Sequence, residues 1–289
     1  MKDYVIVTDS TTDLPASYFE ENHLYCMHLG CVLNGVTYNG DNPLDVHVFY
    51  DGLRKGELPT TSQVNPDDAK QVFLEAMKES KNILCLSFSS GLSGTYNSVR
   101  IAAEELMEED SECNIVVIDT LSASVGEGLL VHYAVKLRDE GKSMEEVAQW
   151  VEENKLKSVH IVVVDDLFHL QRGGRVSKAA AVVGSMINMK PMIHVDNEGK
   201  LVKIDAVRGR KKSLHTAVDY MESHMGTMRD KNEMIFISHA DCEDEAKQIA
   251  DEIKSRFGIE SFLINYIGTV IGSHTGTGTI ALCFLGDER

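Results

Sequence analysis

The chain has 289 residues, a length that predicts two domains of ordinary size. Hydrophobic residues make up 43% of it, and no apolar run reaches the roughly 18 to 20 residues that a membrane span needs. With 28 basic and 45 acidic residues the net charge is −17, which argues against general nucleic-acid binding, because that binding depends on neutralising phosphates.

The cysteines and the N-terminus indicate a cytoplasmic protein. The six cysteines are scattered and form no C-x-x-C pair, so we expect neither a disulfide framework nor a zinc or other metal site. The first nine residues run directly into an apolar strand and lack the small-residue cleavage site of a signal peptide.

The first half of the chain alternates strand-like and helix-like runs. Strands are predicted at residues 4–8, 25–33, 83–88, 115–118 and 160–164. Helices are predicted at residues 16–21, 46–54, 67–79, 99–108, 125–140 and 144–154. Because several strands are apolar on both faces, we expect an α/β layer structure with a mostly parallel sheet flanked by helices.

The pattern changes near residue 165, where we place the boundary between an N-terminal α/β domain (1–165) and a C-terminal α/β domain (166–289). The turn at residues 196–199 predicts a β-hairpin, and hence a mixed or antiparallel second sheet. The predicted elements are a helix at 176–187, strands at 189–195 and 201–207, a helix at 213–225, a strand at 234–238, a helix at 243–257, and strands at 261–266 and 279–285.

Four hydroxyl-rich segments follow predicted strands or precede helices, at residues 8–13, 59–63, 89–98 and 119–124. Any one of them alone is typical of a helix N-cap. In an open α/β sheet, however, ligands bind beyond the carboxyl ends of the strands. Four such segments in one sheet therefore predict a polar crevice.

The segment 89–98, Ser-Ser-Gly-Leu-Ser-Gly-Thr-Tyr-Asn-Ser, is the most informative. It connects a predicted strand to a predicted helix and so places unpaired backbone N–H groups and hydroxyl donors at one point, which suits an anion. The segment contains no Lys or Arg. A single carboxylate therefore fits it better than a polyphosphate.

A second polar segment, residues 268–278, places His274 among glycines and hydroxyls, where an imidazole is able to donate to a carboxylate. Ser93, His274 and either Asp9 or Asp119 would supply the groups of a hydrolase triad, although nothing in their spacing requires one. Gly-Leu-Ser-Gly-Thr is not the G-x-S-x-G motif, and the chain contains neither G-x-x-x-x-G-K-[ST] nor G-x-G-x-x-G.

Positive charge is sparse and clustered. Arg172 and Arg175 flank a pair of glycines, and residues 208–212 read Arg-Gly-Arg-Lys-Lys. Such clusters are either solvated surface or sites that meet a partner or a phosphate.

Six motifs, taken in order, resemble the DegV family of bacterial fatty-acid-binding proteins, and the resemblance covers essentially the whole chain. They are Asp-Ser-Thr-Thr-Asp-Leu-Pro at 9–15, Thr-Thr-Ser-Gln at 60–63, Ser-Ser-Gly-Leu-Ser-Gly-Thr-Tyr at 89–96, Arg-Gly-Gly-Arg-Val-Ser at 172–177, Lys-Pro at 190–191 and His-Thr-Gly at 274–276. The chain departs from the family at Val64-Asn65, where Pro-Ser is frequent, and at Thr277, where a proline is usual.

The resemblance implies a two-domain fold that buries one long-chain fatty acid between its domains. By position, the fatty-acid carboxylate is expected to contact Thr61, Ser62, Ser93, Gly94 and His274. It also implies a separate ATP-dependent fatty acid kinase that converts the bound carboxylate to an acyl phosphate, so that the chain itself is not an enzyme and needs no cofactor. Candidates for docking that kinase are Arg172, Arg175, Arg208 and Arg210. A protein of this kind is also expected to contact the membrane surface transiently.

The hydrocarbon tail needs an apolar lining. Residues that would supply it, or that equally suit an ordinary core, are Val182, Val183, Met186, Ile187, Met189, Met192 and Ile193. Two other functions stay open at this point: an acyl ester hydrolase that uses Ser93 and His274, and a lipid-responsive regulatory module without a kinase partner.

Overall fold

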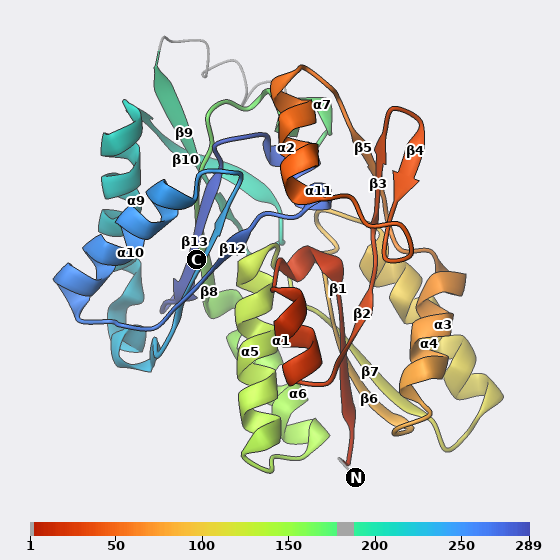
Figure 1. Ribbon diagram of the computed structural model, residues 1–289. Helices are drawn as coiled ribbons and strands as arrows, with labels where there is room; N and C mark the ends of the chain where they lie inside the picture. Colours follow the sequence, from red (N-terminus) through yellow and green to blue (C-terminus); the bar gives the residue numbers. More distant parts are fainter. Residues whose placement is uncertain (1–2, 178–187) are drawn as a thin grey trace.

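A computed structural model describes residues 3–177 and 188–289 and shows a mixed α/β fold of stacked layers (Figure 1). The predicted helix at 176–187 lies outside the described residues apart from Val176 and Ser177, which are not helical. Four candidate lining residues, Val182, Val183, Met186 and Ile187, also lie outside them.

The first sheet is entirely parallel, as predicted. Its strand order is β2-β1-β6-β7. Apolar residues point to both of its faces because helices cover both, and the strands are almost entirely buried at β1 and β6. The strands are β1 (Val5–Asp9), β2 (Leu24–Met27), β6 (Asn82–Ser87) and β7 (Asn114–Asp119).

Helices α3 (Pro66–Ala76) and α4 (Thr95–Glu109) pack on one face of this sheet. Asn65 caps the first of them, and its side chain accepts a hydrogen bond from the Asp68 N–H. The other face meets α5 (Val125–Asp139) and α6 (Met144–Asn154), with α1 (Ala16–Glu21) beside β2.

The second sheet is mixed, with the order β10-β9-β8-β13-β11-β12. The β11–β12 pair is parallel and the other pairs are antiparallel, including the predicted hairpin of β9 and β10. Helices α9 (Arg210–Met225) and α10 (Glu243–Phe257) cover its outer face. Its strands are β8 (Ser158–Val163), β9 (Met189–Val195), β10 (Leu201–Arg208), β11 (Ile235–His239), β12 (Phe262–Tyr266) and β13 (Ile280–Leu285).

Helix α5 lies between the two sheets and contacts both, and this is why its residues 125–131 are all buried (Figure 1). Strand β8 pairs with β9 and β13, so the segment 1–165 supplies one strand to the second sheet. The domain boundary near residue 165 stays a prediction.

A small third sheet, ordered β4-β3-β5, and three short helices lie at one end of the layers (Figure 1). They are β3 (Gly30–Leu33), β4 (Val36–Tyr38), β5 (Thr60–Ser62), α2 (Val46–Arg54), α7 (Phe168–Arg172) and α11 (Thr269–Thr275). Short 3₁₀ turns complete the described elements: η1 (Ser10–Thr12), η2 (Lys155–Lys157) and η4 (Gly226–Lys231).

Two local predictions were wrong. The single strand at 25–33 is two strands in different sheets, because the chain leaves the parallel sheet at residue 28 and joins the third sheet at Gly30. The segment 59–63, expected at the edge of the parallel sheet, instead forms β5 of the third sheet. The glycine-rich segment at 268–278, for which no helix was predicted, contains α11. Its short length gave no helical periodicity to detect.

Within residues 3–177 and 188–289, no helix combines the length and the apolar composition of a membrane-crossing segment.

Candidate ligand-binding site

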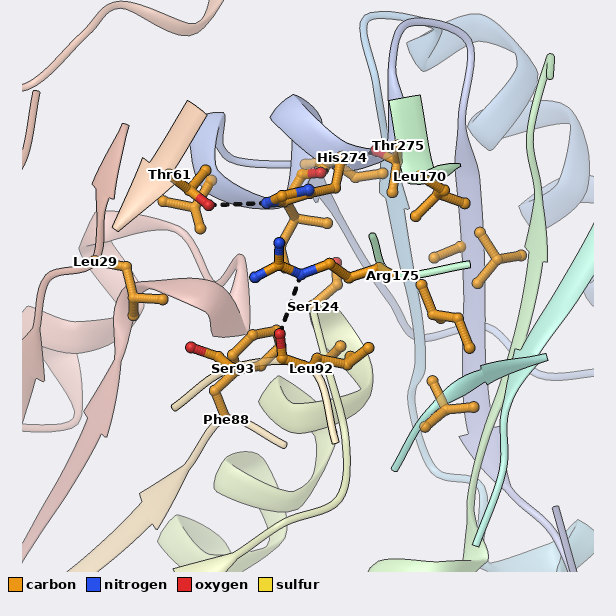
Figure 2. Close-up of a pocket in the computed structure, with 18 of the residues that line it drawn as sticks. Leu29, Thr61, Phe88, Leu92, Ser93, Ser124, Leu170, Arg175, His274 and Thr275 are labelled. Carbon is orange, nitrogen blue, oxygen red and sulfur yellow. Dashed lines mark hydrogen bonds between the residues drawn. The ribbon is translucent and has the colours of Figure 1, made fainter. Parts of the chain in front are cut away.

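A cavity of about 190 Å³ lies where the carboxyl ends of the parallel strands face the second sheet. One wall comes from residues that follow β6 and β7, such as Phe88 and Ala123. Further lining residues come from the third sheet and the short helices (Figure 2). The lining comprises Leu29, Thr61, Ser62, Gln63, Phe88, Leu92, Ser93, Gly94, Ala123, Ser124, His160, Val162, Leu170, Arg175, Ile193, Val195, Leu201, Ile267, Val270, Ile271, His274, Thr275, Thr279 and Ala281.

The opposite wall is a continuous apolar surface of the second sheet. Val162 pairs with Ala281 on one side and with Ile193 on the other, so these three side chains form a row across the strands. Val195 lies two residues farther along the same face of β9. We call Val162, Ile193, Val195 and Ala281 the apolar wall; all four are buried.

The hydroxyl of Thr61 on β5 lies 2.8 Å from Nε2 of His274 on α11. Burial, reinforced by the charges of Arg175 and Arg172, lowers the pKa of His274 to about 4. The imidazole is therefore neutral at pH 7 and has one N–H to donate. Within the described part of the chain its Nδ1 has no hydrogen-bond partner.

Ser93 lies in the loop before α4. Its hydroxyl is 2.9 Å from the Thr95 hydroxyl and accepts the Thr95 N–H. The loop is fixed from the other sheet, because the Ser89 hydroxyl donates to the Gly199 carbonyl at the tip of the β9–β10 hairpin.

Gln63 ties the loop to β5. Its side-chain amide donates to the Ser98 hydroxyl at 3.0 Å. A Cβ at Gly94 would overlap with Oε1 of the Gln63 side chain. Gln63 belongs to the Thr-Thr-Ser-Gln run but was not predicted as a site residue. Its place at the end of a hydroxyl run was the available signal.

Arg175 brings a positive charge to this cavity. Its Nε donates to the Leu92 carbonyl at 3.2 Å, and a terminal nitrogen donates to the Gly173 carbonyl. Burial lowers its pKa, and no acidic side chain in the described ranges forms an ion pair with it. The segment 89–98 itself contains no Lys or Arg, so this charge reaches the cavity from a segment that is distant in sequence.

The other three arginines lie elsewhere. Arg172 donates to the carbonyls of Pro59 and Ser273. Arg210 forms an ion pair with Glu245 at 2.6 Å and also donates to a backbone carbonyl. Arg208, at the end of β10, is exposed. Whether any of them docks a partner stays a prediction.

The cavity brings together all five residues predicted for carboxylate binding, Thr61, Ser62, Ser93, Gly94 and His274. We call these five and Arg175 the polar rim. Thr61, Ser93, Arg175 and His274 are half-buried, while Ser62 and Gly94 are exposed. Their contact with a carboxylate stays a prediction. Of the described candidates for tail lining, Ile193 lines the cavity, whereas Met189 and Met192 do not.

Besides Gln63, four polar lining residues were not predicted: Ser124, His160, Thr275 and Thr279. Ser124 ends one of the hydroxyl-rich segments, which was the available signal. His160 lies inside a buried strand, where burial lowers its pKa to about 3 and its Nδ1 lies 2.9 Å from the Ser158 carbonyl. Nothing in the sequence distinguished it from an ordinary core histidine.

Three buried carboxyl groups lie behind the cavity, on Asp9, Asp13 and Glu127. Asp13 accepts hydrogen bonds from the Ser124 hydroxyl and from the Gly268 N–H at the start of α11. Burial raises its pKa to about 7. No group of side chains among the residues described has an arrangement that would hold a metal ion.

The hydrogen bonds do not assemble the hydrolase triad. His274 meets Thr61, and Ser93 meets Thr95. The Asp119 carboxylate accepts hydrogen bonds from the backbone N–H of Leu121 in its own loop and from that of Ser90 in a neighbouring loop. Asp9 likewise accepts from Thr11 and from the backbone of residue 88.

Sequence comparison identifies the relatives of this chain. A family model described as uncharacterised proteins of the DegV family matches residues 3–287. A DegV domain-containing protein of Clostridium perfringens is 44% identical over 291 residues, which cover 100% of this chain and 99% of the relative. The protein DegV of Bacillus subtilis is 31% identical, over 96% of this chain and 98% of the relative.

Solved structures show the same fold. DegV of Bacillus subtilis, described as a fatty acid binding protein, matches with a TM-score of 0.85 and 30% identity, over 99% of this chain and 100% of that one. A DegV family protein from Thermus thermophilus, whose structure is described in terms of fatty acid binding, matches with a TM-score of 0.87 and 30% identity, over 98% and 99% of the two chains. This chain therefore belongs to the DegV family.

Proposed function

We propose that this protein binds one long-chain fatty acid and presents its carboxylate to a separate ATP-dependent fatty acid kinase. One observation carries the proposal. Hydroxyl, imidazole and guanidinium donors from Thr61, Ser93, His274 and Arg175 gather at one part of a cavity whose opposite wall is apolar. A carboxylate joined to a hydrocarbon chain has the same division into a polar and an apolar part.

The polar rim suits a carboxylate for electrostatic reasons. Arg175 supplies a positive charge that has no acidic partner in the described residues, and Ser93 supplies a hydroxyl donor (Figure 2). Thr61 and the neutral His274 have two polar protons between them, and their mutual hydrogen bond uses one, so the pair supplies one further donor. Hydrogen bonds to a charged acceptor contribute about 1.5–3 kcal/mol each. The rim therefore fixes the orientation of the ligand and selects an acid over a neutral lipid.

The apolar wall suits the hydrocarbon chain. Burial contributes about 0.8 kcal/mol per CH₂, so about fourteen methylenes contribute roughly 11 kcal/mol before the cost of association. The tail thus supplies most of the affinity. The descriptions of the Bacillus and Thermus relatives as fatty acid binding support the same ligand class here.

The exposure of the rim supports the kinase step. Ser62 and Gly94 are exposed, so a carboxylate at the rim is accessible to a partner, while a tail along the wall is buried. In the reaction a carboxylate oxygen attacks the γ-phosphorus of ATP, and ADP leaves. The chain has no P-loop sequence, so we assign the nucleotide to the partner and expect the chain itself to hold the substrate without performing chemistry. Arg175 would meet the phosphoryl group, and the exposed Arg208 would face the partner.

The test uses protein that has been stripped of lipid. We expect calorimetric titration with hexadecanoic acid to show one site, and titration with 1-hexadecanol to show weaker binding. Adding a bacterial fatty acid kinase and ATP to the loaded protein should then yield acyl phosphate. Absence of fatty-acid binding would refute the proposal as a whole. Binding without phosphorylation by any kinase tried would refute only its kinase part.

A further inference from the structure

Arg172, the last residue of α7, joins two segments that are distant in sequence. One of its terminal nitrogens donates to the Pro59 carbonyl at 2.9 Å and to the Ser273 carbonyl at 3.1 Å. Pro59 and Ser273 are both buried. Since buried carbonyl groups need hydrogen-bond partners, the guanidinium satisfies two acceptors at once.

Both carbonyls belong to segments that carry rim residues. Pro59 directly precedes β5, which carries Thr61, and Ser273 directly precedes His274 on α11. Thr61 and His274 are the two residues joined by the 2.8 Å hydrogen bond of the rim. One arginine therefore fixes the backbone on both sides of that bond.

The residue after Arg172 supports the same geometry. Gly173 has no side chain, and a Cβ there would overlap with Nδ1 of His274. The backbone φ of Gly173 is −75°, so its conformation does not itself require glycine, and the close approach of the imidazole explains the residue. Arg172 thus fixes the backbone next to His274, and Gly173 leaves room for the His274 ring.

We propose that Arg172 is a positioning residue of the carboxylate site, which holds Thr61 and His274 at the separation that carboxylate capture requires. The inference rests on the proposed function, because it assigns Arg172 to fatty-acid binding. It also replaces the docking role considered for Arg172, since the guanidinium is engaged with the backbone of its own chain. Arg172 does not line the cavity, so it acts through the residues that do.

The test compares Arg172→Ala and Arg172→Lys with wild type, using the lipid-free protein. We expect the Ala variant to bind hexadecanoic acid about tenfold more weakly, which corresponds to about 1.4 kcal/mol, and to bind 1-hexadecanol within about twofold of wild type. The Lys variant should show a similar loss, because an ammonium keeps the charge but not the planar donor geometry of the guanidinium. Arg256→Ala, which removes a surface arginine on α10, is the matched control and should bind both lipids as wild type does.

Three results would overturn the inference. Unchanged acid affinity in Arg172→Ala would restore a docking role, which would then be visible as slower phosphorylation alone. Equal weakening of acid and alcohol binding would show a general loss of structure. Full recovery in Arg172→Lys would show that charge, and not geometry, is what matters.

Gly173→Ala tests the same geometry without removing a charge, and should also weaken the acid more than the alcohol. Equal effects on the two lipids in this variant would again contradict the positioning role. These outcomes differ from failure of the proposed function, in which wild type itself would bind no fatty acid.

Discussion

The polar rim and the apolar wall of the cavity are built in different ways. The wall is the face of three paired strands, β8, β9 and β13, whose positions are fixed by continuous backbone hydrogen bonding. The rim consists of short segments that are far apart in sequence, namely a three-residue strand, a loop, the residues after α7 and a seven-residue helix. Single side chains such as Gln63 and Arg172 hold these segments together. The wall is therefore insensitive to single hydrogen bonds, whereas the geometry of the rim depends on them.

Removing donors from the rim should have the largest effect. In the double variant Thr61→Ala, Ser93→Ala we expect the affinity for hexadecanoic acid to fall by about 4 kcal/mol, roughly a thousandfold, because two hydrogen bonds to a charged acceptor are lost. Thermal stability should change little, since both side chains are only half-buried. Thr216→Ala, Ser223→Ala on α9 is the control, and titration calorimetry is the measurement. Unchanged affinity in the double variant would show that the carboxylate binds elsewhere.

Lowering the pH should reduce the contribution of His274 to folding stability. The pKa of its imidazole is about 4 in the fold and about 6.5 in an unfolded chain, so the unfolded state binds more protons between these values. The contribution of His274 to stability should therefore fall as the pH drops from 6.5 to 4, by no more than about 3 kcal/mol. His160 contributes with the same sign, because burial also lowers its pKa. Asp13 contributes with the opposite sign, because its pKa is raised to about 7 in the fold.

The contribution of His274 to the pH dependence of stability is measured as the difference between wild type and a variant that lacks the imidazole. The variant His274→Gln should lose part of the pH dependence of lipid-free wild type, as measured by urea unfolding at pH 4.5 and pH 7. Identical pH profiles for the two proteins would contradict a neutral, buried His274.

A larger side chain on the apolar wall should change which acyl chain lengths the protein binds. Recognition of the carboxylate should stay unchanged. Ala281 is buried in the central row, so Ala281→Leu should exclude about two methylenes and weaken binding of an 18-carbon acid by about 1.6 kcal/mol. A 12-carbon acid should bind almost as it does to wild type. Competition between the two acids measures the ratio directly, and equal weakening of both would show that the tail does not follow this row.

Arg208→Ala should have the smallest effect on the lipid. Arg208 is exposed and does not line the cavity, so we expect fatty-acid affinity to stay within about twofold of wild type. A slower kinase reaction at low concentration of the loaded protein would support its docking role. A kinase reaction as fast as that of wild type would remove Arg208 from the docking surface.

The bounds of long elements were more predictable from sequence periodicity than the residues of the apolar wall, because, of the described candidates for tail lining, only Ile193 lines the cavity. The strand at 189–195 and the helices at 46–54, 144–154 and 243–257 match the predicted bounds, because long periodic patterns report burial directly. Motif resemblance, and not periodicity, pointed to Thr61, Ser93 and His274. Neither approach placed Arg175 in the cavity or His160 on its lining, because both positions depend on how distant segments pack.

The two backbone contacts of Arg172 were likewise not predictable from the sequence. Its neighbours Pro59 and Ser273 are more than 100 residues away, at separations of 113 and 101 positions. No local pattern marks such a contact, so the sequence indicated only a clustered positive charge. Packing decides whether such a charge faces a partner or holds its own backbone.

The polar rim and the apolar wall together are expected to hold one fatty acid. The most direct test is mass spectrometry of the lipid released by denaturation from protein purified out of bacterial cells. We expect about one free long-chain fatty acid per protein molecule, and markedly less in the Thr61→Ala, Ser93→Ala variant. Recovery of no fatty acid from wild type, or of neutral lipids without a carboxylate, would contradict this expectation.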